Sequence, residues 1–95
     1  MKTDLIPENP GSIIRAREVD ADCYHLSYAL YRSDFTVNGE HVYSLSVTIQ
    51  SLRETENAFA CDVTRSRSRA LSLFETISRG LVTPCTLYDI LEDML

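Results

Sequence analysis

The sequence predicts an α+β fold: an antiparallel β-meander of three to four strands, followed by a C-terminal αα-hairpin packed on one face. Apolar and polar residues alternate through the first two thirds of the chain, as they do in half-buried strands. After Thr64 the apolar residues recur at helical spacing instead. Since 95 residues suffice for one modest core, we expect a single domain over residues 12–95.

The N-terminal part of the chain gives the weakest pattern. Residues 1–11 include Pro7, Pro10 and Gly11 among polar residues, and chain ends become ordered only where other contacts hold them. We therefore expect a flexible leader there. The first strand, at about residues 12–19, mixes apolar with charged residues, which places it at a sheet edge, where charges discourage further pairing.

Two long strands are predicted at about residues 23–37 and 40–53. Asn38-Gly39 lies between them and favours a type I′ turn, because both residues accept a positive φ. Such a turn pairs Val37 with Glu40, and counting outward sets Leu30 opposite Val47. The apolar residues of both strands then share one face, whereas a one-residue slip would separate them.

A further strand is predicted at about residues 57–63, where apolar residues again occupy alternate positions. A three-residue loop, Glu54–Glu56, would connect it to the preceding strand. This loop sets Ile49 opposite Cys61 and places Phe59 on the same buried face.

Two helices are predicted at about residues 66–79 and 84–94. The apolar stripe of the first consists of Ala70, Leu73, Phe74, Ile77 and Leu81. Gly80 suits the position just after its end, and Thr83-Pro84 provides an N-cap followed by proline at the first helical position. The stripe of the second consists of Leu87, Ile90, Leu91 and Met94. The short link predicts an antiparallel pair that covers the apolar face of the meander.

The composition narrows the classes of function. A net charge of −5 and a pI near 4.8 argue against nucleic acid, because phosphates are bound by basic surfaces. No apolar run approaches the ~20 residues of a membrane span, and no export signal is recognised, so no membrane association is expected. Three widely spaced cysteines, Cys23, Cys61 and Cys85, favour a reducing cytoplasm over a disulfide framework.

An arginine cluster begins the first predicted helix. Arg65, Arg67 and Arg69, together with the hydroxyl of Ser66, could bind a phosphate or carboxylate at free backbone N–H groups. The competing interpretation is a set of structural ion pairs with the acidic end of the antiparallel second helix. Those pairs would join Arg67 and Arg69 to Asp89, Glu92 and Asp93.

No catalytic residue, metal site or cofactor is expected. Cys23 and His25 would share a strand face, but nothing near them completes a nucleophile pair or a metal site, so boundary packing is the simpler interpretation. Cys85 follows the start of the second helix and is also expected to pack. The second face of the sheet, with Tyr31, is expected either to be solvated or to form an interface between two copies.

The C-terminal residues resemble a known family. The pattern runs from Val82-Thr83-Pro84 through Leu87 and Asp89 to Glu92-Asp93, after an earlier Asp62-Val63-Thr64 with Arg67. It is similar to that of small uncharacterised proteins from anaerobic Gram-positive bacteria, catalogued as a domain of unknown function. The resemblance implies a few strands followed by two helices and no activity. The first half, particularly Asn38-Gly39, departs from the pattern.

These observations leave two hypotheses about function. The first is a non-enzymatic protein-interaction or regulatory module, acting as a homodimer or through another protein. The alternative is a small-ligand or anion-binding domain that uses the arginine cluster. The sequence does not identify the biological role, the partner or the oligomeric state.

Overall fold

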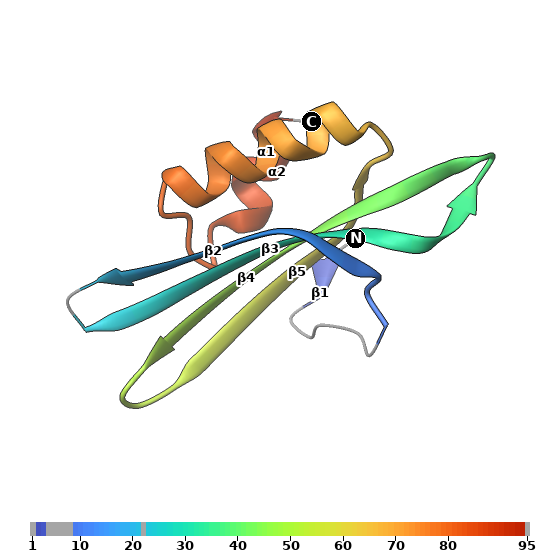
Figure 1. Ribbon diagram of the computed structural model, residues 1–95. Coiled ribbons are helices and arrows are strands. Elements are labelled where there is room, and N and C mark those ends of the chain that lie inside the picture. The colour runs from blue at the N-terminus through green and yellow to red at the C-terminus, as the bar shows by residue number, and fades with distance from the viewer. Residues whose placement is uncertain (1, 4–8, 22, 95) are drawn as a thin grey trace.

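The computed structural model describes residues 2–3, 9–21 and 23–94. In this part of the chain one antiparallel sheet lies under two helices, and both helices cover the same face (Figure 1). The elements are β1 (Lys2–Thr3), β2 (Ser12–Ala21), β3 (Tyr24–Val37), β4 (Glu40–Ser51), β5 (Thr55–Thr64), α1 (Arg67–Arg79) and α2 (Leu87–Met94). The predicted α+β fold is confirmed, with its meander and C-terminal helical hairpin.

The strands lie in the order β1-β5-β4-β3-β2. β2 therefore forms one edge of the sheet, as its charges predict. At the other edge, Lys2 and Thr3 pair with β5, so this part of the predicted flexible leader is a strand. The free edge of β5 offers unpaired backbone groups, and pairing satisfies them. Residues 4–8 of that leader lie outside the described residues.

The turn of the β3–β4 hairpin is confirmed, but the register beyond it is not. Val37 pairs with Glu40, whereas Val47 lies opposite Tyr28 instead of Leu30. The cause is a bulge, in which residues 33–35 of β3 oppose a single residue of β4. Because the register shifts by an even number of residues, the apolar residues of both strands still share the predicted face.

The β4–β5 loop was predicted wrongly. Ile49 pairs with Glu56 rather than with Cys61, an odd shift that moves Phe59 to the face away from the helices. The turn is a compact one closed by Ser51, whose backbone N–H donates to Glu54 O at 2.9 Å and whose Oγ accepts from Glu54 N at 3.3 Å. Because a serine side chain can close a turn, the turn lies closer to the N-terminus than the predicted loop does.

An irregularity near the end of β5 returns its last apolar residue to the helix-covered face. Asp62 has a φ of 54° and interrupts the pairing between Tyr43 and Leu45 of β4. Val63 consequently turns back to the face that the helices cover, where it joins the core. The fully buried members of that core include Leu26, Leu30, Leu45, Val47, Ile77, Leu87 and Leu91.

The ends of the helices differ in detail from the prediction. α1 ends at Arg79 with Gly80 as its C-cap. Gly80 has a φ of −79°, and the left-handed position is Leu81, with a φ of 54°. α2 begins at Leu87 rather than at residue 84, because the N–H groups of Thr86 and Leu87 both donate to Thr83 O at 3.1 Å. Proline at residue 84 thus belongs to a tight turn before the helix.

Candidate functional site

The arginine cluster lies where α1 begins, on the helical side of the molecule. Ser66 is the N-cap of α1, and its Oγ accepts a hydrogen bond from Arg69 N at 3.3 Å. The Arg69 guanidinium donates to the main-chain oxygen of Met94 at 2.7 Å. This contact joins the start of α1 to the end of α2. Two of the four residues proposed for anion binding, Ser66 and Arg69, thus already form hydrogen bonds within the helical hairpin. The predicted ion pairs with Asp89, Glu92 and Asp93 stay predictions.

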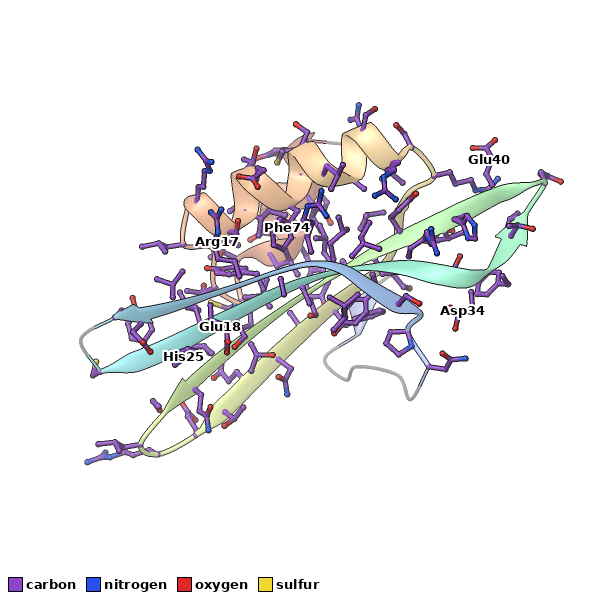
Figure 2. The ribbon with its side chains drawn as sticks, viewed as in Figure 1. Arg17, Glu18, His25, Asp34, Glu40 and Phe74 are labelled. Atoms are coloured by element: carbon purple, nitrogen blue, oxygen red, sulfur yellow. The ribbon has the colours of Figure 1, made fainter. Side chains whose placement is uncertain are left out.

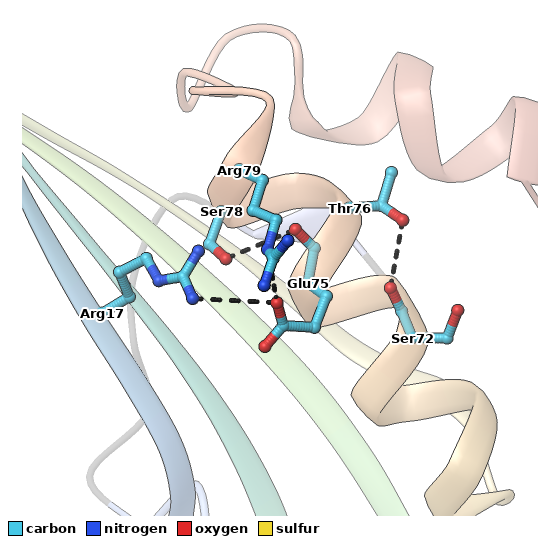
Figure 3. A network of polar contacts seen from close by, with 6 residues as sticks. All are labelled: Arg17, Ser72, Glu75, Thr76, Ser78 and Arg79. Carbon is cyan, nitrogen blue, oxygen red and sulfur yellow. Dashed lines mark hydrogen bonds and ion pairs between the residues drawn. The ribbon is translucent and has the colours of Figure 1, made fainter.

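Ion pairs that the sequence did not predict connect the sheet edge to α1. Glu75 Oε2 lies 2.8 Å from Arg79 Nε, one turn along the helix, and 3.7 Å from Arg17 Nη2 of β2 (Figure 3). All three side chains are partly exposed, so each pair contributes about 1 kcal/mol or less. Arg79 is therefore engaged within α1, and the network ties β2 to the helical layer.

His25 lies between two carboxylates on the face away from the helices. Its Nδ1 is 2.5 Å from Asp20 Oδ1, and its Nε2 is 2.9 Å from Glu18 Oε1. Carboxylates only accept hydrogen bonds near neutral pH, so both contacts together require the doubly protonated ring. The hydrogen bond to Asp20, followed by that to Glu18, raises the pKa of His25 above 6.5.

The two cysteines considered as candidate sites are exposed. Cys23 lies in the turn before β3 rather than within the strand, while Cys85 has its Sγ 3.3 Å from Thr83 Oγ1. The packing role predicted for Cys85 is therefore wrong, because α2 starts after it. Among residues 2–3, 9–21 and 23–94, no group of three or more His, Cys, Asp or Glu side chains could hold a metal ion.

The face of the sheet away from the helices, which we call the back face, is buried at its centre. Tyr31 and Phe59 are 8% and 2% exposed, with ring centroids 5.8 Å apart. Ser44 and Ser46 beside them are also buried. A fully solvated back face is therefore excluded, and the sequence missed this because the predicted register put Phe59 on the other side.

A groove on the back face runs from Phe59 to the β3–β4 hairpin. Its volume is about 280 Å³, and it is lined by Asn9, Pro10, Ser33, Phe35, Val37, Val42, Ser44, Phe59, Cys61 and Asp62. The hairpin projects beyond the helices (Figure 1), and its Phe35 is 64% exposed. The bulge creates this arrangement: Ser33 Oγ accepts from Val42 N at 2.9 Å and donates to Phe35 O at 2.6 Å.

Charged side chains lie on both sides of the sheet. Figure 2 shows Arg17 on the side of the helices and Glu18 and Asp34 on the opposite side. Asp62, which lines the groove, is exposed as well. The back face thus combines an apolar groove with acidic side chains.

Fold and surface together define a small α+β domain with one helix-covered face and one grooved face. The chain belongs to the DUF6514 family, a family of unknown function, which it matches over residues 12–95. The predicted resemblance to a domain of unknown function is confirmed at that level. No curated protein and no solved structure matches the chain significantly. No helix in the described part of the chain is long and apolar enough to cross a membrane.

Proposed function

We propose that this domain is a non-enzymatic protein-interaction or regulatory module that engages its partner through the groove of the back face. The observation that carries the proposal is Phe35, which is 64% exposed beside an apolar groove whose floor contains buried Phe59. Exposed aromatic side chains next to a concave apolar surface are typical anchors of protein interfaces. The acidic back face and the net charge of −5 favour a protein over a nucleic acid.

Anion binding by Arg65, Arg67, Arg69 and Ser66 has less support. Ser66 already caps the helix, and Arg69 already holds the end of α2. We place the module in the cytoplasm, because its three cysteines are widely spaced and two of them, Cys23 and Cys85, are exposed thiols.

Affinity capture from a lysate of the source cells tests this function. The bait would be the tagged wild-type chain, compared with Phe35→Ser and with Leu52→Ser, a control in the β4–β5 turn whose side chain is fully exposed. Wild type and Leu52→Ser should retain the same partner, and Phe35→Ser should lose it. Equal capture by all three baits would contradict a role for the groove.

A further inference from the structure

The groove can receive an apolar side chain. Val42 and Phe59 are buried in its floor, while Phe35 and Val37 rise from the projecting hairpin and Pro10 closes another side. The volume of about 280 Å³ is close to the lower limit for small-molecule pockets, so a few protein side chains fit it better than a drug-sized ligand.

The described residues around the groove include two carboxylates. Asp62 lines it, and Asp34 lies between the lining residues Ser33 and Phe35. None of the described lining residues is Lys or Arg. Both carboxylates are exposed, and Asp34 Oδ1 also accepts a hydrogen bond from Ser12 Oγ at 3.3 Å. Exposed carboxylates of this kind can pair with the cations of a partner.

A second copy of the chain does not supply such cations. In a twofold contact through the groove, the same patch meets itself, so Asp34 and Asp62 would face carboxylates of the partner. Pairing of two β2 edges fails for a related reason, because opposite residues of an antiparallel pair lie on the same side of the sheet. Arg15 and Arg17 lie on one side of β2 and its acids on the other, so such a pair would set no opposite charges against each other.

We propose that the groove binds a segment of another protein in which an apolar side chain is flanked by lysine or arginine. This inference rests on the proposed interaction function and adds the chemistry of the partner. The apolar side chain packs against Phe59 beside Phe35, and the basic side chains pair with Asp62 and Asp34. The negative net charge of the whole chain accelerates the approach of a basic partner.

A library of random dodecapeptides displayed on phage, selected against the immobilised wild-type chain, tests this chemistry. The enriched peptides should combine an aromatic or large aliphatic residue with neighbouring Lys or Arg, and their affinity should fall as salt increases. Enrichment of acidic or neutral peptides, or no enrichment, would overturn the inference. If lysate capture still depended on Phe35 in that case, the interaction function would stand and only the partner chemistry would fail.

Variants then locate the binding of one enriched peptide. Phe35→Ser should weaken it by about tenfold or more, and Asp34→Asn combined with Asp62→Asn by about fivefold, with a smaller dependence on salt. Asparagine suits position 62, where φ is 54°, because it tolerates the left-handed conformation. Leu52→Ser should bind as the wild type does. Unchanged binding to Phe35→Ser, or a wild-type dimer that Phe35→Ser dissociates, would overturn the assignment.

Discussion

The two faces of the sheet are built from the same strands but differ in what they hold. The helix-covered face is dry and continuous, with side chains such as Leu26, Leu30 and Leu45 at 1% exposure or less. The back face buries a smaller central set, Tyr31, Phe59 and Val42 among serines, and opens toward the projecting hairpin. The helix-covered face therefore holds most of the buried apolar core, whereas the back face keeps an open groove, which is why we assign binding to the back face.

The largest expected effect compares the stability lost by a substitution on the helix-covered face with that lost by a substitution on the back face. Leu30→Ala should lower the free energy of unfolding by about 3 kcal/mol, because Leu30 is fully buried and its removal leaves a cavity. Ser27→Ala, on the other face of the same strand, should change it by about 0.5 kcal/mol or less. Urea denaturation measures both. Similar losses for the two variants would break the comparison.

A smaller effect is expected at the contact between the sheet and the link that joins the helices. The Tyr28 hydroxyl donates to the buried oxygen of Val82 at 2.9 Å, and burial raises its pKa to about 12. Tyr28→Phe leaves that oxygen without its donor, so unfolding should require about 1–2 kcal/mol less. Thermal denaturation checks this value, and an unchanged melting temperature would show that the link is not anchored there.

The end of α1 offers a stabilising change on the helix-covered side. Leu81 adopts a φ of 54°, a conformation that costs non-glycine residues about 1–2 kcal/mol. Leu81→Gly should therefore add about 0.5–1 kcal/mol to the free energy of unfolding, after the greater entropy of glycine in the unfolded chain is subtracted. Leu81→Ala is the matched control and should give no gain. A loss of stability in Leu81→Gly would mean that its packing outweighs the backbone strain.

The smallest expected effect concerns His25 on the back face. Its pKa is raised above 6.5 in the folded protein, so the stabilisation is complete below about pH 6.5 and disappears as the pH rises through the raised pKa. His25→Gln should therefore cost more stability at about pH 6 than at about pH 9. Denaturation of both proteins at the two pH values measures this difference. A cost independent of pH would contradict the contacts to Asp20 and Glu18.

The sequence was sufficient for the fold class, because alternation and helical spacing are both strong signals in this chain. It did not predict the register of the strands where a side chain forms the hydrogen bonds that shape a bulge or a turn. Ser33 stabilises a bulge in β3 and Ser51 closes the β4–β5 turn, and neither effect follows from apolar periodicity. The odd register shift in β5 then reversed the predicted orientation of Phe59.

The candidate site was predictable only in part for the same reason. The back face could be identified as unassigned, but its groove depends on the bulge that exposes Phe35 and on the true position of Phe59. The arginine cluster was predicted as a candidate anion site because arginine side chains bind anions. The antiparallel hairpin also predicted Arg69 beside the end of the second helix, but its acceptor there, the main-chain oxygen of Met94, does not follow from the local sequence.

Site-specific photocrosslinking compares the two faces most directly. A benzoylphenylalanine would replace Phe35 on the back face or Leu81 on the helical side, since the two side chains are 64% and 47% exposed. In a lysate of the source cells, our account predicts a discrete crosslinked partner from position 35 and none from position 81. Crosslinking from position 81 with none from position 35 would contradict the assignment of binding to the back face.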